Sequence, residues 1–124
     1  MLLVTSRDSG RFVIPKGNIG AGLTPREAGA KEAFEEAGVT GTIEGEFPIG
    51  FFTYQKHLPD GSVEPATVEV YPLHVERQRK RWPEKKERRL SWVSPEQAAK
   101  LVAEPSLARL FVRFVEIMKE REQG

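Results

Sequence analysis

The chain has 124 residues, with 19 lysines and arginines, 18 acidic residues and no cysteine. This length suits one domain, residues 1–124, and an apolar fraction of 39% with 11 glycines excludes wholesale disorder. The absence of cysteine excludes disulfides, thiolate metal sites and a cysteine nucleophile. The apolar run Met1–Val4 is too short for a signal peptide or membrane span, so we expect a soluble cytoplasmic protein. A net charge of +1 argues against binding duplex DNA by bulk charge.

Strand-like and helical segments alternate along the chain. Short β-branched or aromatic runs beside turn residues predict strands at Met1–Thr5, Phe12–Pro15, Ile49–Lys56, Thr67–Glu76 and Arg88–Val93. Pro72 falls inside the fourth run and indicates a sheet edge or a bulge there. Ser94 caps a helix that Pro105 interrupts, and a last amphipathic helix follows. This order of elements predicts an α/β (α+β) sandwich.

An earlier helix has start and stop signals on both sides. Thr24 can cap its N-terminus, Pro25 suits the first helical position, and Glu27 completes a capping box. Gly38 is a natural C-terminal stop. The expected helix therefore runs from Pro25 to Ala37.

Three glutamates share one face of this helix. At about 100° per residue, Glu35 lies near −60° and Glu36 near +40° from Glu32. A separate stripe of apolar side chains, Ala30, Ala33, Phe34 and Ala37, suits the core. Facing carboxylates form either a solvated acidic surface or a site for a hard divalent cation, which relieves their repulsion by oxygen coordination. The spacing alone leaves both interpretations open.

The same segment resembles the Nudix box, G-x5-E-x7-R-E-U-x-E-E-x-G-U, in which U is a bulky aliphatic residue. The residues that fall in register are Gly17, Glu32, Glu35, Glu36, Gly38 and Val39. Leu23 replaces a glutamate, Lys31 replaces the arginine, and Ala33 is smaller than usual. In the family the arginine orients the second glutamate of the box, and lysine cannot make a two-pronged contact. These departures bear on rate and metal affinity more than on the fold.

The resemblance implies a metal-dependent hydrolase of organic diphosphates with a Nudix-type α/β/α sandwich and a mixed central sheet. It assigns Mg²⁺ or Mn²⁺ to the catalytic glutamates Glu32, Glu35 and Glu36, with the Gly17 carbonyl as a further ligand. Such ions polarise phosphoryl oxygens and generate hydroxide from bound water. Which carboxylate acts as the base stays open. Glu84 and Glu87 are either additional candidate bases or surface glutamates.

Two further segments resemble the diphosphoinositol polyphosphate phosphohydrolase-like branch of this family. Residues 11–17, Arg-Phe-Val-Ile-Pro-Lys-Gly, are similar to its R-W-x-x-P-K-G motif. Trp82-Pro83-Glu84, followed by Arg88-Arg89 and Trp92, is similar to its later signature. The branch acts on diphosphoinositol polyphosphates and diadenosine polyphosphates, which are densely anionic small molecules.

The segment 77–89, which we call the basic strip, carries a net charge of +6, whereas the rest of the chain carries −5. If it faces the metal site, it would attract a polyphosphate by steering and by charge-assisted hydrogen bonds. The alternative is a solvated loop, or one that holds acidic faces of the same molecule. The candidate substrate-binding residues are Lys16, Arg79, Lys80, Arg81 and Arg88.

Three functions stay open. The first is cleavage of a pyrophosphate bond in a dinucleoside polyphosphate, a diphosphoinositol polyphosphate or a similar organic diphosphate. The second is a general nucleotide-clearing Nudix pyrophosphatase for nucleoside triphosphates or nucleotide sugars. Leu23 and Lys31 also keep open a non-catalytic Nudix-fold module that binds its ligand without turnover.

Nudix proteins usually carry a strand before the one expected at Met1–Thr5. Here that strand is absent, is supplied by a partner subunit, or belongs to a natural start upstream. Because an open sheet edge favours association, we expect a homodimer.

Overall fold

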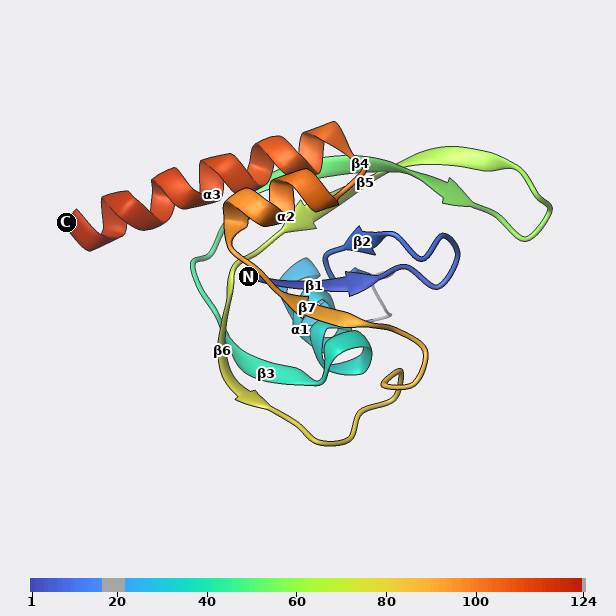
Figure 1. Cartoon of the computed structure of the whole chain (residues 1–124), viewed down its shortest axis with the longest axis horizontal. Helices are drawn as coiled ribbons and strands as arrows, with labels where there is room; N and C mark the ends of the chain where they lie inside the picture. The colour runs from blue at the N-terminus through green and yellow to red at the C-terminus, as the bar shows by residue number, and fades with distance from the viewer. Residues whose placement is uncertain (17–21, 124) are drawn as a thin grey trace.

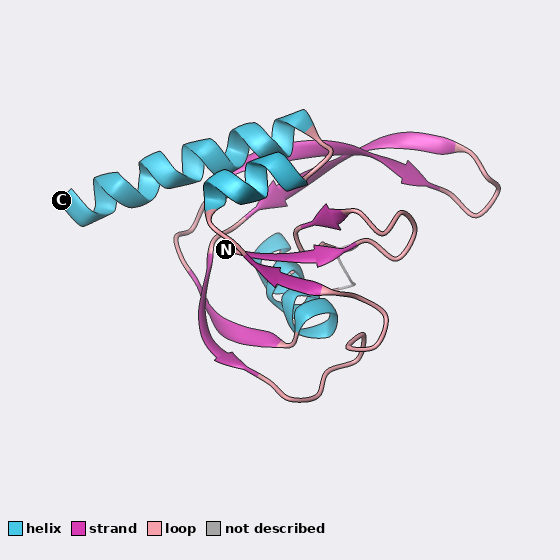
Figure 2. Ribbon diagram, in the orientation of Figure 1, coloured by secondary structure: helices cyan, strands magenta, loops and turns pink. Residues whose placement is uncertain are grey.

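Seven strands and three helices make up the described part of the chain, residues 1–16 and 22–123 of a computed structural model. The strands are β1 (Leu2–Thr5), β2 (Phe12–Val13), β3 (Val39–Ile43), β4 (Gly50–His57), β5 (Val63–Val70), β6 (Leu73–Gln78) and β7 (Leu90–Trp92). The helices are α1 (Pro25–Ala37), α2 (Pro95–Leu101) and α3 (Pro105–Gln123). α2 packs against α3, α3 packs against β4, and α1 packs against β3 (Figure 1, Figure 2). The predicted α+β fold is confirmed.

The strands form three small antiparallel sheets. β1 is the middle strand of the order β2-β1-β7, β3 pairs with β6, and β4 pairs with β5. The predicted mixed central sheet does not form within the described residues, where parallel pairing is limited to an isolated bridge between Phe12 and Val102. β2 is only two residues long, and Pro15 soon after it has no N–H with which to extend that bridge.

The single strand expected at Thr67–Glu76 is wrong, because the structure has two strands there. β5 pairs with β4, and after Tyr71-Pro72 the chain continues as β6, which pairs with β3. Pro72 cannot donate a ladder hydrogen bond, so it marks the point where the chain changes partners.

β3 was not predicted, because Gly41 interrupts its short apolar run. A Cβ at this glycine would lie 1.9 Å from the carbonyl oxygen of His74, and the β3–β6 register shifts between Thr40 and Gly41. Glycine is therefore required for the close approach of the two strands.

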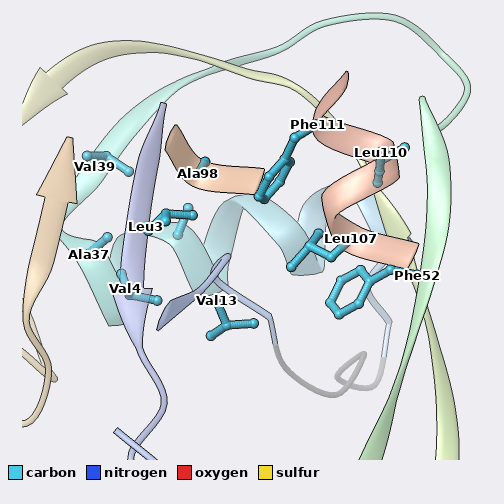
Figure 3. Close-up of a cluster of buried hydrophobic side chains, with 11 residues drawn as sticks. Leu3, Val4, Val13, Ala37, Val39, Phe52, Ala98, Leu107, Leu110 and Phe111 are labelled. Atoms are coloured by element: carbon cyan, nitrogen blue, oxygen red, sulfur yellow. The ribbon is translucent and has the colours of Figure 1, made fainter. Parts of the chain in front are cut away.

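The hydrophobic core forms where β1 meets α1, α3 and β4 (Figure 3). Leu3, Val4, Ala37 and Leu107 have no exposed surface, and Phe52 on β4 is 1% exposed. The predicted apolar stripe of α3 is buried at Leu107, Leu110 and Phe111, and half-buried at Phe114, Ile117 and Met118. Side chains from the helices and strands thus share one core.

A mainly apolar cavity of about 400 Å³ lies between α1, α3 and strands β3, β5 and β6. Its described lining does not include Glu32, Glu35 or Glu36, so this cavity is separate from the predicted site. None of the helices in the described part has the length and apolar character needed to cross a bilayer.

Helix α1 has the predicted bounds and the predicted caps. The Thr24 side chain accepts a hydrogen bond from the Glu27 backbone at 3.2 Å, and the Glu27 carboxylate accepts one from the Thr24 backbone at 3.3 Å. At the other end, the N–H of Gly38 donates to the carbonyl of Phe34 at 2.8 Å. The left-handed φ of 70° at Gly38 ends the helix.

We expect Gly38→Ala to destabilise the protein by more than about 1 kcal/mol, because alanine is strained at this φ. The added Cβ would also lie 2.2 Å from the Trp82 ring. Gly29→Ala is the matched control, since nothing lies within 4 Å of its added Cβ, and it should gain about 0.5–1 kcal/mol in the helix interior. Urea denaturation compares the two variants, and equal effects would contradict this role for Gly38.

Candidate active site

Among the described residues, Glu36 is the only charged residue that is buried, with 2% of its surface exposed. It lies in the last turn of α1, and both of its carboxylate oxygens have partners. Oε2 accepts a hydrogen bond from the backbone N–H of Lys16 at 3.2 Å. Oε1 lies 3.4 Å from Nη1 of Arg88. The chain therefore fixes this carboxylate from two segments outside the helix.

Burial raises the pKa of Glu36 to about 8, against an ordinary value of 4.5. Arg88 opposes this rise in pKa, whereas a hydrogen bond with Glu32 and the negative charges of Glu32 and Glu84 add to it. Without a compensating cation, the protonated form is thus favoured in the folded state.

The other two predicted ligands have different surroundings. Glu32 is half-buried and lies beside Glu36, with which it shares that hydrogen bond. The Glu35 carboxylate forms an ion pair with Lys31, with Nζ and Oε1 3.7 Å apart. Within residues 1–16 and 22–123, no three acidic or histidine side chains gather closely enough to hold a metal ion. The structure thus brings Glu32 and Glu36 together, and Glu35 turns toward Lys31.

Arg88, predicted to bind substrate, has its guanidinium engaged inside the protein. Its Nε and Nη2 lie 2.9 and 2.8 Å from Oε1 of Glu84, and its Nη1 donates to the carbonyl of Thr5 at 2.9 Å. Its side chain is only 10% exposed. These contacts correct the expected role, because the guanidinium faces carboxylates of its own chain rather than solvent.

The backbone of the basic strip binds the C-terminal end of α1. The N–H of Arg79 donates to the carbonyl of Gly38 at 2.8 Å, and that of Glu84 donates to the carbonyl of Glu35 at 3.0 Å. The Gln78 side chain donates to the carbonyl of Ala37 at 2.9 Å. These contacts satisfy helix carbonyls that would otherwise have no partner, and they place cations where the helix dipole favours them. They also bring the strip beside the last turn of α1, which carries Glu36.

The predicted cationic side chains Arg79, Lys80 and Arg81 are exposed. Together with Arg77 and Gln78 they line an open hollow of about 500 Å³. The exposed cations and the inward-facing Arg88 thus divide the strip into an outward and an inward part.

The two candidate bases after the box are both bound to arginines. Glu84 is bound by Arg88, and Arg7 adds an ion pair at 3.6 Å. Glu87 is exposed and lies 3.4 Å from Nη1 of Arg7. Arg7 was not among the predicted site residues, because nothing in the pattern of its hairpin loop connects it to residues 84–87.

Lys16 contributes to the site through its backbone and packs its side chain on an aromatic ring. Its Nζ lies 4.1 Å from the centroid of the Tyr54 ring, a cation–π contact. Burial lowers the pKa of Lys16, and Arg88 lowers it further, whereas Glu36 opposes the change. The neighbouring Gly17, expected to supply a carbonyl ligand, lies outside the described residues.

The chemistry of these donors fits a hard divalent cation. Glu32 and Glu36 offer only oxygen ligands, the kind that Mg²⁺ and Mn²⁺ prefer. Glu36 is held in a position where burial and a neighbouring carboxylate oppose its ionisation. A bound cation would favour the ionised form and offset both effects.

We expect the stability of the metal-free protein to fall as pH rises from about 4.5 to 8, because the pKa of Glu36 is about 8 in the folded chain and 4.5 in the unfolded one. Over this range the unfolded chain loses the proton at no cost, whereas the folded chain must keep it or bury a charge. The Glu36→Gln variant lacks this component, so the difference in melting temperature between variant and wild type should widen toward pH 8.5 in EDTA. Mg²⁺ should make this difference in melting temperature smaller. If the melting temperatures of the two proteins change with pH in parallel, the raised pKa is not that of Glu36.

Comparison with known proteins places this α+β fold in a family. Residues 1–114 match the NUDIX domain. The chain belongs to the NUDIX domain family. It is 28% identical over 126 residues to mitochondrial Nudix hydrolase 12 of Arabidopsis thaliana, covering 99% of this chain and 62% of that protein. It is 32% identical over 104 residues to chloroplastic Nudix hydrolase 21 of the same plant, covering 82% and 49%. The chain thus spans about half to three-fifths of the length of these relatives.

Two solved structures are similar in fold. The C. elegans Ap4A hydrolase superposes with a TM-score of 0.62 at 17% identity, covering 94% of this chain and 84% of that one. The E. coli ORF135 protein gives a TM-score of 0.52 at 19% identity, covering 97% and 82%. At these identities the likeness concerns the fold alone.

Proposed function

We propose that this protein is a Mg²⁺- or Mn²⁺-dependent hydrolase that cleaves a pyrophosphate bond in a dinucleoside polyphosphate, a diphosphoinositol polyphosphate or a similar organic diphosphate. The observation that carries the proposal is the buried carboxylate of Glu36, held beside Glu32 at the end of α1 to which the basic strip is bound. Membership of the NUDIX domain family and the names of the relatives agree with this chemistry.

In this proposal, the α1 glutamates hold the metal and orient the reacting phosphoryl group. Glu32 and Glu36 are the main ligands, and Glu35 joins them if its exposed ion pair with Lys31 opens. A bound divalent ion would polarise the phosphoryl oxygens and lower the pKa of a coordinated water. The backbone N–H of Lys16 and the guanidinium of Arg88 keep Glu36 in one position. Which carboxylate acts as the base stays unassigned, and Glu84 and Glu87 remain additional candidates.

The exposed part of the basic strip favours a long, densely charged substrate. The side chain of Gln78 is hydrogen-bonded to the carbonyl of Ala37 at the end of α1. The next three residues of the chain are Arg79, Lys80 and Arg81. A polyphosphate whose scissile bond lies at Glu36 would extend toward these cations, where charge-assisted hydrogen bonds are stronger than neutral ones.

Replacing Arg79, Lys80 and Arg81 together by glutamine should lower kcat/KM on diadenosine tetraphosphate at least tenfold, or about 1.4 kcal/mol. The loss should be smaller on ATP, which offers fewer phosphates, and it should shrink at high ionic strength. The matched control replaces the exposed Lys100, Arg109 and Arg113 of α2 and α3 by glutamine. Rates on a substrate panel with and without Mg²⁺ test this, and an equal loss on both substrates would favour the general nucleotide-clearing function.

A second candidate, a module that binds its ligand without turnover, is favoured by one observation. Lys31 stands at the position of the box arginine, but its ion pair is with Glu35. Glu32 therefore lacks the arginine contact that orients the corresponding glutamate in the family. Calorimetry with a non-hydrolysable diadenosine polyphosphate separates the candidates. Tight binding combined with no turnover on any panel member would favour the module.

A further inference from the structure

We propose that Arg88, in the loop that precedes β7, is a positioning residue for Glu36 and supplies the guanidinium that position 31 of α1 lacks. This inference rests on the proposed metal-binding role of Glu36. Position 31, where the Nudix box has arginine, is a lysine bound to Glu35. Arg88 is 52 positions after Glu36 in the chain, and yet it makes the guanidinium contact to the box.

Besides its contact with Glu36, the guanidinium of Arg88 has three contacts that fix its position. Glu84 binds Nε and Nη2 at 2.9 and 2.8 Å, and the carbonyl of Thr5 accepts from Nη1 at 2.9 Å. Glu84 is itself tied to α1, because its N–H donates to the carbonyl of Glu35 at 3.0 Å. Thr5 in turn lies in β1, next to β7. Arg88 is thereby oriented by α1, through Glu84, and by β1, the middle strand of the β2-β1-β7 sheet, through Thr5.

The contact with Glu36 is longer than the others. Nη1 lies 3.4 Å from Oε1, beyond the usual hydrogen-bond range of about 2.7–3.2 Å for N–H···O. Nη1 has a second N–H besides the one used by Thr5. Arg88 therefore draws the carboxylate toward one orientation without occupying the lone pairs of Oε1, which stay available for a cation. Its own charge is balanced by Glu84, so it does not simply repel a metal ion.

A lysine could not replace Arg88 here. Its single ammonium group cannot bind Glu84 with two N–H groups, reach the Thr5 carbonyl and approach Glu36 at the same time. Partners that orient a metal ligand in this way typically change metal affinity by about 10–100-fold when removed.

The test is Mn²⁺ binding to the full chain, measured by electron paramagnetic resonance. Arg88→Ala and Arg88→Lys should each bind Mn²⁺ at least tenfold more weakly than the wild type, whereas Arg109→Ala, which removes an exposed arginine of α3, should not. About 20–50 mM guanidinium chloride should restore much of the affinity of Arg88→Ala, since the ion fits the vacated place beside Glu84. Sodium chloride at the same concentration should not restore it.

The outcomes separate this inference from the proposed function. Unchanged or tighter Mn²⁺ binding by both Arg88 variants would overturn the positioning role, and tighter binding would show that Arg88 competes with the metal. Weaker binding by Arg88→Ala without guanidinium rescue would also overturn it, because a general folding defect has no reason to respond to that ion. If Arg88→Ala does not fold, Arg88→Lys decides by its affinity alone. Wild-type protein that binds Mn²⁺ but hydrolyses nothing would contradict the proposed function and leave the Arg88 result intact, whereas wild-type protein that binds no Mn²⁺ would overturn both.

Discussion

Glu36→Gln is expected to lower turnover of diadenosine tetraphosphate by about 10³-fold, or about 4 kcal/mol of transition-state stabilisation. The reason is that Glu36 is the buried oxygen donor whose two oxygens the chain holds in place. An amide has nearly the same shape but cannot supply the negative charge that a divalent cation requires. Initial rates with saturating Mg²⁺ or Mn²⁺ give the comparison.

The same substitution should leave folding intact or improve it in the absence of metal. Glutamine removes a group whose ionised form is disfavoured by burial, and Arg88 keeps its stronger partner Glu84. The control is Glu120→Gln, which removes an exposed carboxylate of α3 and should change neither rate nor melting temperature. Turnover of Glu36→Gln equal to that of the wild type would refute the role of this carboxylate.

Phe52→Ala is expected to destabilise the protein by about 3–5 kcal/mol, the largest stability effect among these variants. The Phe52 side chain is 1% exposed and belongs to the core cluster that joins β4 to β1 and α3. Removing the ring loses its burial and leaves a space that the neighbouring side chains cannot fully occupy. Urea denaturation measures the loss.

The neighbouring residue offers a matched control for Phe52. Phe51 is 55% exposed on the opposite face of the same strand, so Phe51→Ala should change stability by no more than about 0.5 kcal/mol. Similar losses for the two phenylalanines would contradict the packing described for β4.

Helix α1 could be predicted with its bounds because every signal that sets them is local. The cap at Thr24, the capping box at Glu27 and the left-handed turn at Gly38 each act within one turn of the helix. The α3 stripe followed from the helical period in the same way. The strand boundaries around Pro72 and Gly41 could not be predicted, because they depend on which distant strand the chain pairs with.

The candidate site shows the same division between local and distant information. The shared face of Glu32 and Glu36 follows from helix geometry, and the structure places these two together. The inward position of Arg88 depends on Glu84, Thr5 and Glu36 meeting in space, and no spacing in the sequence encodes that. A charge count therefore found the basic strip but could not tell its inward-facing arginine from its exposed ones.

The central claim, that this protein hydrolyses a phosphoric anhydride with a divalent metal, is tested most directly with isotopically labelled water. Wild-type protein is incubated with diadenosine tetraphosphate and Mg²⁺ in H₂¹⁸O, and the products are analysed by mass spectrometry. We predict that one ¹⁸O atom enters one of the two product phosphates, since water breaks a single P–O–P link, and that EDTA abolishes product formation. Intact substrate under saturating Mg²⁺ or Mn²⁺, or product formation at the same rate in EDTA, would contradict the claim.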